Sequence, residues 1–217
     1  NAGDPSVNEL EIFYSFHDKF SLELLPPTLH EAIRVELGEH RTIEVDGRKV
    51  GRAYHRAHDP LTGDHHIDVF LEPGAPPGSW QVRLVSRDVV DGRFSGWIER
   101  DSAVPGLQSR FDAADASPRS TIGTIATGYR TLVVGAADTT GPITIASFSS
   151  SGPTRDGRIK PDLLAPGVSI AGARSTPAGA EPGSGGITRY SGSSMAAPHV
   201  SGTIAALFAA APRKLHI

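Results

Sequence analysis

The chain of 217 residues contains no cysteine, which excludes disulfide bonds and thiolate chemistry and leaves the cellular compartment open. It has no apolar run near the roughly 20 residues that cross a bilayer, and residues 1–8 lack the basic and apolar regions of a signal peptide. A net charge of −3 offers no basic surface for nucleic acid. We therefore expect a globular protein with neither a nucleic-acid nor a membrane partner.

Short alternating segments separated by turn residues fill the first part of the chain. Leu10, Ile12 and Tyr14 alternate with other residues, as a half-buried strand requires. The pair Asp46-Gly47 accepts the positive φ of a tight hairpin turn. At least six such segments predict an antiparallel β-sandwich. A short helix at residues 29–37 is the one alternative to strand in this region.

The second part has a different pattern. Residues 101–120 are polar and predict a linker, whereas 131–137 form a continuous apolar run typical of a buried strand in a parallel sheet. A strong helix begins near Ser193, and Pro212 ends it. Because the residues on all faces of this helix are apolar or small, we expect it to be buried on most of its surface.

Ser194 lies at the start of that helix. A serine hydroxyl becomes a nucleophile only when a base takes its proton and donors receive the developing oxyanion. The first turn of a helix offers free backbone N–H groups and the positive end of the dipole. Ser193 is the expected N-cap, and the alternative is that both serines only cap the helix.

The string Gly-Ser-Ser-Met-Ala-Ala-Pro-His-Val-Ser-Gly at 192–202 resembles the nucleophile motif of subtilisin-like serine peptidases, the subtilases of peptidase family S8. Ser193 stands where that family usually has Thr, and Pro198 has its place in the motif. Further similar segments lie at 131–138, 146–153 and 160–168, so the resemblance covers about residues 121–212. It implies a partial subtilisin-like α/β domain with a parallel sheet, with Ser194 as the nucleophile of an endopeptidase that acts on peptide or protein substrates.

The order of the catalytic residues along the chain distinguishes the subtilase interpretation from that of an α/β-hydrolase. Gly192, Ser194 and Ala196 also fit the nucleophile elbow of an α/β-hydrolase, in which the acid and the base follow the serine. Only 23 residues follow Ser194, and none of them is Asp or Glu, which excludes that fold. His199 lies about 140° round the helix from Ser194, so we expect it to be a buried structural histidine.

The other two members of a triad are not recognisable. In subtilases the base opens a His-Gly-Thr segment, but none of the nine histidines here precedes glycine, and Asp156 lies in an unrelated turn. We expect the base and its aspartate N-terminal to Asn1, so the chain alone should be inactive. The alternative is a pseudo-protease or regulatory protein on a subtilase scaffold. Asn1-Ala2-Gly3 resembles the family's oxyanion segment, which implies that Asn1 is a second oxyanion donor.

These interpretations divide the chain into a protease segment at 1–7, an inserted sandwich at 8–100, a linker at 101–120 and the C-terminal part of the catalytic domain at 121–217. The insertion resembles the jelly roll of germination-associated bacterial subtilases. We expect it to brace the protease; a carbohydrate- or protein-binding module is the alternative. The incomplete sheet predicts self-association, and the resemblance implies a secreted or cell-envelope protein.

A group of histidines and aspartates in the sandwich has no standard metal-ligand spacing. We expect a solvated hairpin loop there, and no metal or cofactor in this chain, although the resemblance allows calcium in the full-length family. The residues concerned are His58, Asp59, Asp64, His65, His66 and Asp68.

Overall fold

The structure is a computed structural model that describes residues 3–99, 106–175 and 185–211. The chain divides into two compact units, Asn1–Ala116 and Ser117–Ile217, hereafter unit 1 and unit 2. Among the described residues, no helix is long and apolar enough to span a bilayer. Asn1, the predicted oxyanion donor, lies outside the described residues.

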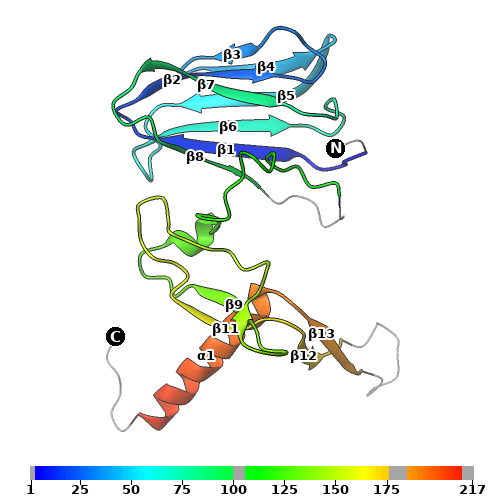
Figure 1. Cartoon of the computed structure of the whole chain (residues 1–217), viewed down its shortest axis with the longest axis vertical. Coiled ribbons are helices and arrows are strands. Elements are labelled where there is room, and N and C mark those ends of the chain that lie inside the picture. The colour runs from blue at the N-terminus through cyan, green and yellow to red at the C-terminus, as the bar shows by residue number, and fades with distance from the viewer. Residues whose placement is uncertain (1–2, 100–105, 176–184, 212–217) are drawn as a thin grey trace. The chain divides into compact units, whose positions relative to one another are not determined.

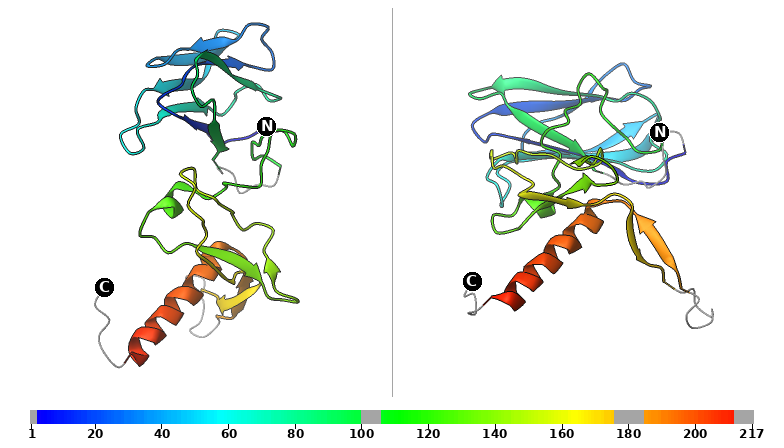
Figure 2. Two further views of the ribbon diagram at one scale, coloured as in Figure 1. Left: turned by 60° about the vertical axis from the view of Figure 1, so that its left-hand side comes forward. Right: turned by 60° about the horizontal axis from the view of Figure 1, so that its bottom comes forward.

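Unit 1 consists of two antiparallel sheets that share one core (Figures 1 and 2). Its strands are β1 (Asn8–Tyr14), β2 (Lys19–Leu25), β3 (Ile33–Val35), β4 (His40–Val45), β5 (Arg48–Arg56), β6 (His65–Leu71), β7 (Gln81–Asp88) and β8 (Phe94–Ile98). The larger sheet has the order β4-β5-β6-β1-β8 and the smaller one β3-β2-β7. Both contribute alternate apolar residues to the core, among them Ile12, Leu22 and Ile67. The period-two pattern is satisfied because each strand has one face on that core.

The alternative of a helix at residues 29–37 is wrong. Ile33–Val35 forms β3, which pairs antiparallel with β2 so that Val35 lies opposite Leu22. Val35 is fully buried in the shared core. Cross-strand pairing and burial of alternate residues outweigh the local tendency towards helix.

One buried carboxylate organises the turn between β7 and β8. Asp18 is fully buried and accepts hydrogen bonds from the backbone N–H groups of Val90, Asp91 and Gly92 at 2.7, 2.9 and 2.9 Å. Burial by itself raises the pKa of Asp18, but these three donors outweigh it and hold the pKa below its ordinary value. The turn is therefore attached to the chain between β1 and β2.

Unit 2 is smaller and is built around a parallel strand pair. Its elements are the 3-10 helix η1 (Thr124–Thr127), β9 (Val134–Asp138), β10 (Thr144–Ile145), β11 (Leu163–Pro166), β12 (Ile170–Ala173), β13 (Ile187–Tyr190) and α1 (Ser193–Ala210). The sheet order is β10-β9-β11, with β9 and β11 parallel and β10 antiparallel to β9. β12 and β13 form an antiparallel pair. A buried group of small residues holds α1 to this sheet: Ala136, Ala146, Ala165 and Ala196.

The expectation that α1 is buried on most of its surface is wrong. Ala196 is its one buried residue, whereas Leu207 and Phe208 near its end are 63 % and 43 % exposed. The helix contacts β9 and β11 through its first turns and then runs beyond the small sheet (Figures 1 and 2). In the described part of unit 2, no element covers its second half.

A buried lysine links two segments beside β9 and β11. Lys160 donates from Nζ to the Thr131 carbonyl at 2.8 Å and to Asp162 Oδ2 at 2.7 Å. The same carboxylate oxygen accepts the Val133 N–H at 2.7 Å. Hydrogen bonds from Lys160 and Val133 hold the pKa of Asp162 below its ordinary value. The ammonium and carboxylate thus join the residues before β11 to the entry of β9.

Candidate active site

Ser194 is exposed in the first turn of α1. The residue at the N-cap is Gly192, with no side-chain hydrogen bond to the helix. The prediction that Ser193 is the N-cap is therefore wrong, since Ser193 is already helical. The N–H groups of Ser193 and Ser194 occupy the first helical positions, which have no intrahelical acceptor. They and the helix dipole favour negative charge beside the Ser194 hydroxyl.

The turn before Ser194 is attached to the carboxyl end of the parallel strands. Gly192 donates its N–H to the Gly167 carbonyl at 2.8 Å, and Gly167 donates to the Ala137 carbonyl at 2.9 Å. Gly167 directly follows β11, and Ala137 belongs to β9. Ligands and reacting groups in open α/β sheets bind at this edge. The fold therefore places the serine at the edge where such sites form.

Gly167 allows this attachment because it has no side chain. A Cβ on Gly167 would lie 2.7 Å from the Ala136 Cβ and 3.0 Å from the Gly192 carbonyl oxygen. The Ala136 methyl group is fixed directly to the backbone of a fully buried residue, and the Gly192 oxygen is itself a backbone atom, so neither can turn away. The distance between the strand edge and the start of α1 thus depends on glycine at this position.

His199 does not act on Ser194. Its Nδ1 lies 2.8 Å from the carbonyl oxygen of Met195, four residues earlier in the same helix. The expected hydrogen-bonded role is present, but the expected burial is wrong, since His199 is exposed on α1. Within the described part of unit 2, His199 is the one histidine, and no hydrogen bond joins it to the Ser194 hydroxyl.

Asp156, which the sequence placed outside the triad, has other partners. Its carboxylate accepts from Arg158 Nε at 2.8 Å and from the Tyr129 hydroxyl at 3.1 Å. Hydrogen bonds from Arg158, Thr154 and Tyr129 lower the pKa of Asp156 to about 2. This cluster stabilises the turn between Thr154 and Arg158.

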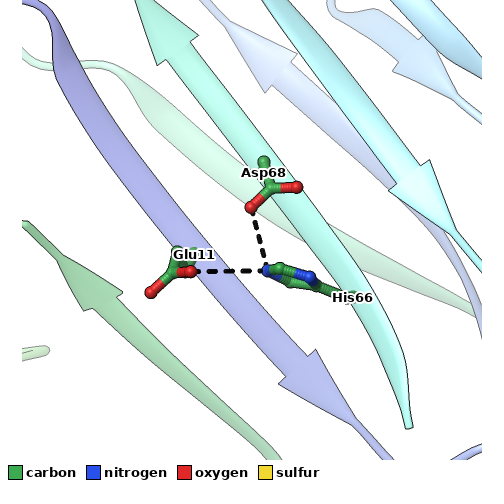
Figure 3. A group of neighbouring side chains, drawn as sticks. All are labelled: Glu11, His66 and Asp68. Carbon is green, nitrogen blue, oxygen red and sulfur yellow. Dashed lines mark ion pairs between the residues drawn. The ribbon is translucent and has the colours of Figure 1, made fainter. Parts of the chain in front are cut away.

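Unit 1 contains a second group of polar residues, and the expectation of a solvated loop is wrong for its main members. His65, His66 and Asp68 belong to β6 and are buried. His66 Nε2 lies 2.9 Å from Asp68 Oδ1 and 3.6 Å from Glu11 Oε1 (Figure 3). Burial lowers the pKa of His66, but the carboxylates of Asp68 and Glu11 outweigh it and raise the pKa to about 9. The sequence indicated the residue types but not the pairing of β6 with β1, which brings Glu11 to them.

The sequence matches the subtilase family of peptidase S8 over residues 108–216. The motif around Ser194, the parallel strands and this match agree, and the chain belongs to the subtilase family. Known proteases resemble it in parts. It is 48 % identical to pyrolysin of Pyrococcus furiosus over 69 residues, which are 32 % of this chain and 4 % of pyrolysin. It is 44 % identical to serine protease AprX of Bacillus subtilis over 69 residues, 29 % of this chain and 16 % of AprX.

A solved structure extends the similarity to both units. The chain superimposes on the CspB protease of Clostridium perfringens with a TM-score of 0.70 and 27 % identity, covering 96 % of this chain and 42 % of the CspB chain. The β-rich fold with one helix is therefore that of part of a subtilisin-like protease. The chain corresponds to less than half of CspB and to a small part of the curated relatives it matches.

Proposed function

We propose that the protein acts as a serine endopeptidase through an acyl-enzyme on Ser194. The observation that carries this proposal is the exposed serine in the first turn of α1, at the carboxyl edge of β9 and β11. The subtilase match over residues 108–216 supports it, as do the proteases among its relatives.

In the proposed reaction, Ser194 Oγ forms a bond to the carbonyl carbon of the peptide, and the carbonyl electron pair moves to its oxygen. The Ser194 N–H is one donor to this oxyanion. A base takes the hydroxyl proton and gives it to the leaving amine as the C–N bond breaks. Water then hydrolyses the acyl ester and restores the hydroxyl. Asn1 is the proposed second oxyanion donor.

We assign the base and its aspartate to residues outside this chain. The one described histidine of unit 2 is engaged with the helix backbone, and no histidine of the sequence precedes glycine. The exposed apolar residues of α1, Leu207 and Phe208, support a further part of the protein packing there. The chain alone is then inactive, and the same exposed surface and incomplete sheet favour self-association of the isolated chain.

A reactive fluorophosphonate tests the nucleophile, because it labels a serine only when a base activates it. In the full-length protein, we expect labelling and peptide hydrolysis to be lost in Ser194→Ala and kept in Ser193→Ala. Ser193 is the matched control, since it is the exposed neighbour in the same helical turn. The isolated chain should neither be labelled by the fluorophosphonate nor hydrolyse the peptide.

The competing function is a pseudo-protease that binds without cleaving. An unlabelled full-length protein, with Ser194 intact and α1 folded, would establish it and overturn the endopeptidase. Turnover by the isolated chain that Ser194→Ala abolishes would instead refute the assignment of the base to another part of the protein.

For unit 1 we propose the role of a brace inserted into the catalytic domain as a jelly roll. The similarity to CspB over 96 % of the chain supports this, because it includes both units. The insertion would separate the oxyanion segment at 1–7 from residues 121–217. A glycan array and a peptide library applied to the full chain test the alternative of a ligand-binding module. Saturable binding that substitutions on the surface of unit 1 remove would favour that alternative.

A further inference from the structure

One imidazole and two carboxylates gather on the face of the large sheet that points away from the core of unit 1. Glu11 in β1 lies directly opposite Asp68 in β6. His66 is two residues before Asp68 and shares its face, because side chains alternate along a strand. One ligand atom from each residue lies within 4.8 Å of the other two (Figure 3). We propose that these three side chains bind one divalent transition-metal cation of the Zn²⁺ type.

The first argument is an unsatisfied buried nitrogen. His66 is 6 % exposed and Asp68 is 2 % exposed. Within the described part of the chain, His66 Nε2 makes no hydrogen bond of good geometry, although Asp68 Oδ1 and Glu11 Oε1 lie 2.9 and 3.6 Å from it. A buried polar atom without a partner is costly. A cation between Nε2 and the two carboxylates would replace the proton on Nε2, which is released on binding, and would contact all three groups directly.

The donor set and its spacing select the kind of ion. Calcium takes six to eight oxygen ligands, whereas this site presents a nitrogen and two carboxylates. Such a set suits Zn²⁺, whose bonds to His and carboxylate are about 2.0–2.2 Å. A tetrahedron with bonds of that length has edges of about 3.3–3.6 Å. Nε2 lies 2.9 Å from the Asp68 oxygen, which is shorter than such an edge, and 3.6 Å from the Glu11 oxygen, which matches one.

The imidazole is already oriented for this role. Phe13 stacks on the His66 ring, with the centroids 3.9 Å apart and the planes 13° from parallel. On the far side of the ring, Nδ1 lies 3.5 Å from Asp59 Oδ2. The other oxygen of Asp59 is held by the N–H groups of Leu61 and Thr62. Metal-bound histidines commonly donate their second N–H to such a carboxylate.

Arg56 contacts both Asp68 and His66, and one of these two contacts has to change when the ion binds. Its Nη1 forms an ion pair with Asp68 Oδ2 at 2.5 Å, while the other oxygen, Oδ1, faces His66 Nε2. The same Nη1 lies 3.3 Å from His66 Nδ1. An ion on Nε2 requires the imidazole proton to be on Nδ1, so Nδ1 no longer accepts from Arg56 and donates to Asp59 instead, while Arg56 keeps its ion pair with Asp68.

The test uses the full chain after dialysis against EDTA, with Zn²⁺ as the probe. We expect one Zn²⁺ per chain by calorimetric titration, and a rise in the urea midpoint of unfolding when zinc is present. Tryptophan fluorescence reports this unit, because Trp80 and Trp97, the two tryptophans of the chain, both belong to unit 1. Ca²⁺ at the same concentration should leave the midpoint unchanged.

Two ligand variants and one control make the assignment specific. Glu11→Gln and His66→Gln should each weaken zinc binding at least tenfold and remove the zinc-dependent shift. Asp59→Asn, which changes a positioning residue, should weaken binding roughly 10- to 100-fold. His40→Gln is the control, because His40 is an exposed histidine in β4 of the same sheet; it should bind zinc as the wild type does.

The proposal is overturned if the wild type takes up no zinc at a free Zn²⁺ concentration of about 100 μM, which would saturate a site with a micromolar dissociation constant. It is equally overturned if Glu11→Gln and His66→Gln bind zinc as tightly as the wild type. Glu11 is partly exposed, so Glu11→Gln keeps the test valid should His66→Gln fail to fold. None of these outcomes depends on peptidase activity.

Discussion

Alanine at position 167 should displace the start of α1 and with it Ser194. The added Cβ would lie 2.7 Å from the Ala136 Cβ, roughly 1 Å inside the usual carbon–carbon contact of 3.5–4.0 Å. It would also lie 3.0 Å from the Gly192 carbonyl oxygen. Ala136 is fully buried in β9, so the turn that carries Gly192 has to move. Overpacking of this kind costs about 1–3 kcal/mol.

The free energy of unfolding of unit 2 measures this cost. Urea unfolding followed by circular dichroism at 222 nm is suitable, because α1 is the one α-helix among the described residues. In the full-length protein, a shift of the nucleophile by about 1 Å should slow fluorophosphonate labelling by up to ~100-fold. Tryptophan fluorescence should change little, since both tryptophans belong to unit 1.

Gly172→Ala is the matched control for this prediction. Gly172 lies in β12 of the same unit, and a Cβ there would meet no heavy atom within 4 Å. Its effect on stability should stay within about 0.5 kcal/mol. The reasoning fails if Gly167→Ala has the same free energy of unfolding and the same rate of fluorophosphonate labelling as Gly172→Ala. The close contact between the strand edge and the helix start would then not position Ser194.

Three further substitutions test single buried groups. Asp18→Ala removes the acceptor of three backbone N–H groups and should lower the free energy of unfolding of unit 1 by about 2–3 kcal/mol. Tryptophan fluorescence should show a lower urea midpoint, and an unchanged midpoint would contradict this expectation. Lys160→Met removes hydrogen bonds to the Thr131 carbonyl and to Asp162, and should lower the stability of unit 2 by about 2 kcal/mol, seen at 222 nm. Burial holds the pKa of His55 below its ordinary value, so the neutral side chain contributes stability that is present above about pH 6.5 and lost as the pH falls below it. His55→Gln should reduce the acid slope of the unfolding free energy by at most about 1.4 kcal/mol per pH unit, and an identical slope in both proteins would refute this.

Much of the local structure follows from the order of residues alone. The alternation of Leu10, Ile12 and Tyr14 predicts β1, and the apolar run at 131–137 predicts the parallel strand β9. The start of α1 at Ser193 and the family of the protein follow from the motif around Ser194. These features depend on neighbouring residues, so a linear pattern contains them.

Features that depend on distant partners were decided by the tertiary structure. The composition of α1 indicated an apolar helix, but only the small sheet beneath its first turns decided which part is covered. Residues 29–37 could have been helical, and the pairing of Val35 with Leu22 made Ile33–Val35 a strand instead.

The same difference between local and long-range features applies to Ser194 and to the polar group in unit 1. Ser194 was recognisable from its motif, because the serine and the helix start that favours negative charge beside it are adjacent in sequence. The group of Glu11, His66 and Asp68 was not, because Glu11 and His66 are 55 positions apart in the sequence and only the register of β1 against β6 joins them. Periodicity identifies the residues that share one face of a strand. The pairing of strands decides which residues of another segment lie beside that face. Burial then shifts the pKa values of these residues.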